Sequence, residues 1–206
     1  DVKAYAANFL KGMKLLNLLF IPSYIVIFIL AEDIVDVLLG SKWSAIVTPM
    51  RILCLVMPLR AFEVLFIPAM NGLGKSNITM LTSGLSLIVM VCAFMIGINW
   101  GYIGLCWAWA VGFPIIYFVM IVICINYLNI KVSSLAHAYK APLISSVCIF
   151  MIGIPILNNY QQGIQPLVKI IAYSTASIFL NLVTIYFVDR TLFTILRNVY
   201  RNGAMI

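Results

Sequence analysis

Charged residues are scarce in this sequence, and that scarcity excludes most soluble folds. Only 9% of the 206 residues are charged and 64% are hydrophobic, whereas a soluble domain carries about 25% charged residues. The 13 Lys and Arg against 6 Asp and Glu give a net charge of +7. These basic residues stand at the ends of apolar runs and not in one patch, so nucleic acid is not an expected partner. The composition predicts an all-α membrane protein.

Patterns that carry catalysis or metal binding are also missing. The five cysteines lie inside apolar runs without a CxxC pair, which indicates packing residues and not disulfides or metal ligands. The single histidine, His137, has no partner motif around it. There is no GxSxG, HExxH, Walker-type phosphate loop or paired-carboxylate pattern. We therefore expect no enzyme, no metal and no cofactor.

What the sequence does contain is a series of apolar runs long enough to cross a bilayer. A spanning helix needs about 20 predominantly apolar residues. The uncharged stretch 76–130 would be about 80 Å long as one helix, so we expect it to fold back near 97–104. The six expected spans cover about residues 14–31, 46–70, 77–97, 103–127, 142–157 and 167–188.

The segments between these spans divide the chain into two parts. Residues 1–127 hold the first four spans, and residues 128–206 hold two additional spans and a tail. We expect a short amphipathic piece at 32–39, a loop at 129–140 and an amphipathic interfacial helix after Asp189. Because the chain begins with Asp1 and not with Met, we interpret it as a piece of a longer protein.

The distribution of basic residues predicts an orientation. With six spans, both ends of the chain lie on one side of the membrane. Nine Lys and Arg fall on that side, and two, Lys42 and Lys169, fall on the other. Positive residues concentrate on the cytoplasmic side, so both ends are expected to be cytoplasmic.

Three charged residues inside the second span are the candidate site residues. Arg60 and Glu63 lie near its middle, where a charge costs at least about 2.5–3.5 kcal/mol to insert. Their i, i+3 spacing permits an ion pair, so they are either a structural pair or the wall of a substrate cavity. Arg51 lies nearer the end of the span, and either reaches the interface or faces the same cavity.

Small residues recur in the fourth expected span. Gly104, Ala108 and Gly112 follow one another at intervals of four. Such spacing lets two membrane helices approach closely. We predict that this stripe packs against a neighbouring helix and is not a substrate site.

Four stretches of the first 127 residues together resemble a known family. They read AEDIVDVLLGSKW, TPMRILCLVMPLRAF, NGLGKSN and NWGYIGLCWAWAVG. They resemble the Wzx-type polysaccharide flippases of the multidrug/oligosaccharidyl-lipid/polysaccharide exporter superfamily. The chain departs from that pattern at Leu38-Leu39, where Leu-Phe is usual, and at Asn71, where Ala is usual.

The resemblance implies a transporter of two helical lobes around a cavity that opens alternately to each side. This chain would supply most of the C-terminal lobe and two extra helices. The implied substrate is an undecaprenyl-pyrophosphate-linked oligosaccharide, moved across the bacterial inner membrane to the periplasmic leaflet for O-antigen, lipopolysaccharide or exopolysaccharide synthesis. Arg51 and Arg60 would then face the pyrophosphate, and Glu63 would couple transport to H⁺ or Na⁺.

Three alternatives stay open at this point. A drug/cation antiporter of the same superfamily would favour an acidic cavity, and Glu63 is the only central acid. A membrane-embedded polysaccharide polymerase would carry a large periplasmic loop with arginines, whereas the longest outer connection here, about 32–45, holds one Lys. A structural membrane subunit would leave the charges inside the second span unexplained.

Overall fold

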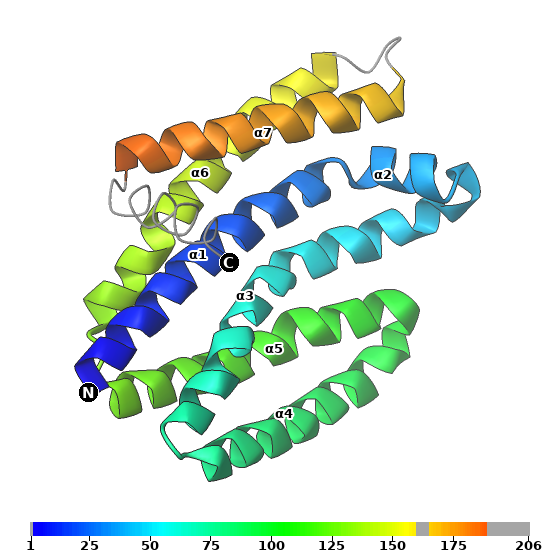
Figure 1. The fold of residues 1–206 in the computed structure, drawn as a ribbon. Helices are drawn as coiled ribbons and strands as arrows, with labels where there is room; N and C mark the ends of the chain where they lie inside the picture. The colour runs from blue at the N-terminus through cyan, green and yellow to red at the C-terminus, as the bar shows by residue number, and fades with distance from the viewer. Residues whose placement is uncertain (1, 160–164, 189–206) are drawn as a thin grey trace, which may run out of the picture.

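The computed structural model describes residues 2–159 and 165–188, which form helices joined by short connections (Figure 1). No strand occurs within those two ranges. In chain order the elements are α1 (Val2–Ile29), α2 (Ala31–Leu38), the 3-10 helix η1 (Ser41–Ile46), α3 (Val47–Gly72), α4 (Ser76–Gly97), the 3-10 helix η2 (Ile98–Trp100), α5 (Gly101–Leu128), α6 (Val132–Asn159) and α7 (Pro166–Val188).

The long helices pack in a row whose order differs from their order in the chain. Neighbours in this row are α4, α5, α3, α1, α6 and α7, and α7 also contacts α2 (Figure 1). The first helix therefore lies in the middle, between α3 and α6. Its inner face, with Phe9 and Met13, meets Phe62 and Phe66 of α3 in the largest apolar cluster. Phe62 in turn contacts Tyr117 of α5 edge to face.

Several of these helices are long and apolar enough to cross a membrane, as the sequence predicts. Segment 76–128 contains α4 and α5, which fold back on each other through η2 (Figure 1). Gly101 at the reversal has a φ of 66°, a conformation that glycine adopts without steric cost. The expected fold-back is confirmed, whereas six membrane crossings stay a prediction. The apolar segments are Val2–Ile29, Ser41–Gly72, Ser76–Leu128, Val132–Gly153 and Pro166–Thr184.

One expectation about local structure is wrong. The expected loop 129–140 is mostly helix because α6 begins at Val132, and helix α1 likewise begins at Val2, before the expected span. Membrane helices can continue beyond the hydrocarbon core, so charged residues mark the interface and not the helix end. Leu135 and Ala138 are buried one turn apart, which holds the first turns of α6 against the bundle. The expected amphipathic tail lies outside the described residues.

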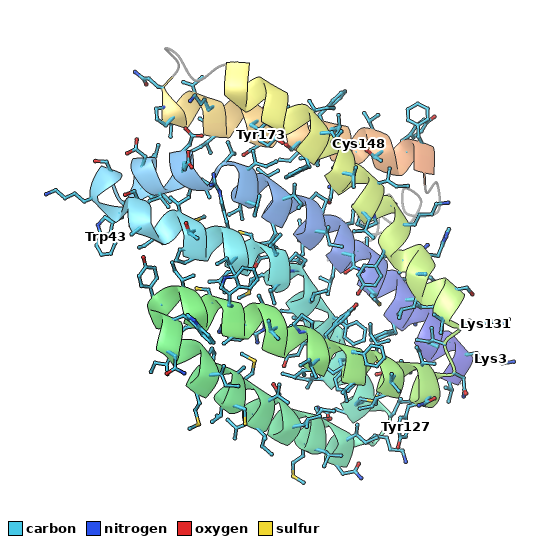
Figure 2. All side chains as sticks on the ribbon, turned by 180° about the vertical axis from the view of Figure 1, so that it is seen from behind. Lys3, Trp43, Tyr127, Lys131, Cys148 and Tyr173 are labelled. Carbon is cyan, nitrogen blue, oxygen red and sulfur yellow. The ribbon has the colours of Figure 1, made fainter. Side chains whose placement is uncertain are left out.

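The connections between helices gather at two opposite ends of the bundle. The chain start and the turns α3–α4 and α5–α6 lie at one end, while η1, η2 and the start of α7 lie at the other (Figure 1). Figure 2 accordingly shows Lys3 and Lys131 together at one end and Trp43 at the opposite end. This arrangement matches the expected alternation, and the cytoplasmic assignment of the first end stays a prediction.

The stripe of small residues on α5 packs against α4, as expected. Gly104, Ala108 and Gly112 are all buried. A Cβ atom added to Gly97 of α4 would lie 3.2 Å from the Cβ of Ala108, and one added to Gly112 would lie 3.1 Å from the sulfur of Met90. The two helix backbones therefore approach each other closely, so the predicted packing contact is confirmed, whereas the lack of a substrate role for this stripe stays a prediction.

A polar side chain of α7 donates a hydrogen bond to the carbonyl that a proline in α1 leaves without its helical donor. Pro22 has no N–H, so it leaves the carbonyl of Leu18 without its helical donor. The side-chain amide of Asn181 donates to that Leu18 oxygen at 3.1 Å, and the Ser145 hydroxyl donates to the Asn181 oxygen at 3.0 Å. A membrane helix tolerates proline when a neighbour satisfies the freed carbonyl in this way.

We expect Asn181→Leu to destabilise the protein by about 1 kcal/mol, because the bond to the Leu18 carbonyl is lost within the bilayer. In a Pro22→Ala background the same change should cost less, since an alanine at that position supplies the missing helical N–H. Thermal unfolding of the four proteins of this double-mutant cycle measures the coupling. Equal costs in both backgrounds would show that Asn181 does not act through the proline.

Candidate functional site

Arg60 and Glu63 form an ion pair in the middle of α3. Arg60 is the fourteenth of the 26 residues of this helix, and its guanidinium lies 3.3 Å from the Glu63 carboxylate. The side chains are 45% and 23% exposed, so the pair is not buried within the described part of the chain. Whether the pair is structural or forms the wall of a substrate cavity stays a prediction.

Two aromatic rings of α5 position the arginine. The Arg60 guanidinium carbon lies 5.2 Å from the centre of the Trp109 ring and 5.7 Å from that of Phe113. A guanidinium over aromatic faces is held by cation–π attraction while its N–H groups stay available. The spacing of these residues in the sequence does not predict this contact. The contact forms because α3 packs against α5.

The pair opens into a pocket between α1 and α3. The pocket has a volume of about 440 Å³. One wall is aromatic, because Phe20 and Tyr24 of α1 stack with ring centres 6.2 Å apart. A pocket with a cation, a carboxylate and an aromatic wall can bind an anionic and hydroxyl-rich group. Its lining residues are Phe20, Tyr24, Met57, Arg60, Ala61, Glu63, Val64 and Ile67.

The third predicted site residue lies elsewhere. Arg51 pairs with Glu32 of α2 at 3.1 Å, and its Nε donates to the carbonyl oxygen of Phe28 at 3.4 Å. That carbonyl belongs to the last turn of α1, where a cation is favourable for the helix dipole. Arg51 does not line the pocket of Arg60 and Glu63, so the structure favours an interfacial position for it.

The sequence analysis missed two further polar features. Lys169 of α7 pairs with Asp33 of α2 at 3.7 Å, which joins α7 to the end of the bundle that holds α2. In the core, the hydroxyls of Tyr117 and Tyr139 hydrogen-bond. Each partner lies on a different helix, so spacing in the sequence does not reveal the contact.

No group of three metal-binding side chains occurs in the residues that the structure describes. The cation, the carboxylate and the aromatic wall of the Arg60–Glu63 pocket are groups that can bind a polar ligand without a covalent bond.

Residues 1–48 match the model of a family described as polysaccharide biosynthesis protein. This match spans α1, α2 and η1, and so includes the aromatic wall of the pocket and the acids that pair with Arg51 and Lys169. It covers 48 of the 206 residues and therefore supports a polysaccharide biosynthesis type of protein without fixing its substrate. No curated protein and no solved structure matches the chain.

Proposed function

We propose that this chain is part of a flippase that moves a lipid-linked oligosaccharide, of the undecaprenyl-pyrophosphate type, across a bacterial inner membrane. The observation that carries the proposal is the Arg60–Glu63 pair, half-exposed in a pocket at the middle of α3. The polysaccharide biosynthesis match over residues 1–48 supports a role in that process. Movement from the cytoplasmic to the periplasmic leaflet, with both ends of the chain cytoplasmic, is part of this proposal.

The pocket suits an anionic headgroup better than a cation. Arg60 can offer two parallel N–H donors to a phosphate, and the rings of Trp109 and Phe113 keep the guanidinium in place without using those donors. A drug/cation antiporter would place an unpaired acid in the cavity. Here Glu63, the one acid lining this pocket, is already neutralised by Arg60.

The same geometry gives a route for coupling. A pyrophosphate that binds Arg60 competes with Glu63 for the guanidinium, because both are anions at one set of donors. Glu63, released from Arg60, is then the carboxylate that would bind the coupling ion. Binding of the substrate and of the coupling ion would thus be linked through one ion pair.

The test is transport by the full-length protein in proteoliposomes. We expect a fluorescent undecaprenyl-pyrophosphate-linked sugar to move between leaflets in its presence, with a rate that depends on a H⁺ or Na⁺ gradient. Liposomes without protein serve as the control. Exchange of organic cations for H⁺ without movement of the lipid-linked sugar would favour the antiporter, and formation of longer glycan chains would favour a polymerase.

A further inference from the structure

A second polar pocket lies at the end of the bundle where the chain begins. It has a volume of about 630 Å³ and lies between α1 and α6. Helix α1 contributes two lysines, while α6 contributes two hydroxyls and an imidazole from more than 100 positions further along the chain. Its lining residues are Ala7, Leu10, Lys11, Lys14, Ser133, Ser134 and His137.

The surroundings of this pocket are positively charged. Among the residues that the structure describes, the acids are Glu63 in mid-helix and three in α2, which lies at the opposite end of the bundle (Figure 1). Lys3 and Lys131 stand at the pocket's own end (Figure 2). The potential there is therefore favourable for an anion. The start of α6, with its partial positive charge, adds to this effect.

The pocket lies at the depth of lipid headgroups. Helix α1 has 28 residues and is about 42 Å long, which exceeds a hydrocarbon core of about 30 Å. Its uncharged part begins after Lys14, and the uncharged part of α6 begins after Lys140. Lys11, Lys14 and His137 therefore fall at the boundary between the core and water.

An apolar track leads from the pocket along α6. Ile144, Cys148 and Met151 follow His137 at intervals of seven, eleven and fourteen residues, which places them on one stripe of the helix. All three are exposed at the surface of the described chain. Figure 2 shows Cys148 on α6, away from the lysine end. A hydrocarbon chain can lie on this stripe while a charged group sits in the pocket.

We propose that the pocket between α1 and α6 binds the phosphate of an anionic membrane lipid, whose acyl chain lies along the stripe of α6. The lysine ammonium groups and the serine hydroxyls supply donors for a phosphate. Basic pockets between membrane helices are typical sites for anionic headgroups. The apolar track distinguishes a lipid from a free phosphate ester. This site is separate from the Arg60–Glu63 pocket and does not depend on the transported substrate.

Native mass spectrometry of the full-length protein in detergent tests this site. The probes are phosphatidylglycerol, phosphatidylcholine and soluble glycerol 3-phosphate. We expect preferential binding of phosphatidylglycerol, weakened about fivefold by Lys11→Gln, because one lysine near an anionic headgroup has an effect of that size. Lys75→Gln removes the same charge at the same end but outside the pocket, and should weaken binding less than about twofold because that charge is screened.

Three results would overturn the proposal. Equal weakening by Lys11→Gln and Lys75→Gln would indicate non-specific attraction to a basic surface. Competition by glycerol 3-phosphate at the same concentration as the lipid would indicate a soluble phosphate ligand. Equal binding of phosphatidylcholine would remove the role of the charges. Thermal unfolding of both variants, expected to match wild type because both lysines are exposed, confirms that the fold is intact.

Discussion

Replacing Arg60 by alanine is expected to lower transport of the lipid-linked oligosaccharide about 10- to 100-fold. The change removes the guanidinium that faces the pocket, and a hydrogen bond to a charged group contributes about 1.5–3 kcal/mol. The Arg60 side chain is half-exposed and packs against the rings of Trp109 and Phe113. The protein should therefore still fold without it. Transport in proteoliposomes and protein level in the membrane are measured together.

Arg51→Ala is the matched control for this prediction. It removes the same side chain from the same helix, but Arg51 pairs with Glu32 at the bundle end and lies outside the pocket. Transport should stay near the wild-type rate, because an exposed ion pair contributes at most about 1 kcal/mol to stability.

The double change Arg60→Leu with Glu63→Leu separates the two interpretations of the pair. If Arg60 serves only to neutralise Glu63, an apolar replacement of both partners should be nearly neutral. Full transport by the double variant would therefore contradict a role in substrate binding. We expect it to be as inactive as Arg60→Ala, because the pocket then lacks its cation.

Gly104→Ala is expected to destabilise the protein by about 1–3 kcal/mol, the usual cost of overpacking. The added Cβ would meet the carbonyl oxygen of Gly97 on α4 and the Cβ of Trp100 at 2.8 Å. A backbone oxygen is fixed by the helix and does not move aside as a flexible side chain does. The measurement is thermal unfolding of the purified protein, with transport falling in proportion to the loss of folded protein.

Gly84→Ala should change the stability in the opposite direction, and it serves as the control. Gly84 lies inside α4, where an added Cβ meets nothing within 4 Å. Alanine is favoured over glycine in a helix interior by about 0.5–1 kcal/mol, so this change should be neutral or stabilising. If Gly104→Ala melts at the wild-type temperature but loses transport, the stripe lines the transport pathway and does not act through packing.

The hydrocarbon core makes much of this fold predictable from sequence. A helix must be about 20 apolar residues long to cross it. The bounds of α3, α4, α5 and α7 accordingly lie within two residues of the expected bounds at every end. The break in the uncharged stretch is predictable for the same reason, since one helix of that length does not fit. The start of α6 was not predictable, because interfacial charges do not end a helix.

The candidate site was predictable only in part. Arg60 and Glu63 can be identified as candidates from the sequence because charge inside an apolar span is costly. Their spacing of three residues predicts that they pair. Trp109 and Phe113 carry no such signal, because their contact with Arg60 depends on which helices become neighbours. The same holds for Asn181, whose partner is a carbonyl freed by Pro22, 159 positions earlier in the chain.

The sequence by itself thus determined a helical membrane protein, the approximate positions of most long apolar helices and the two charges in the middle of α3, because the thickness of the bilayer constrains the length and composition of each helix. Only the tertiary structure decided that α1 lies between α3 and α6, that Arg51 belongs to the bundle end, and that Lys11 meets His137 in one pocket. These outcomes depend on packing between helices. Apolar surfaces are nearly equivalent to one another in lipid, so the choice of neighbours rests on small residues and scattered polar contacts that no single span reveals.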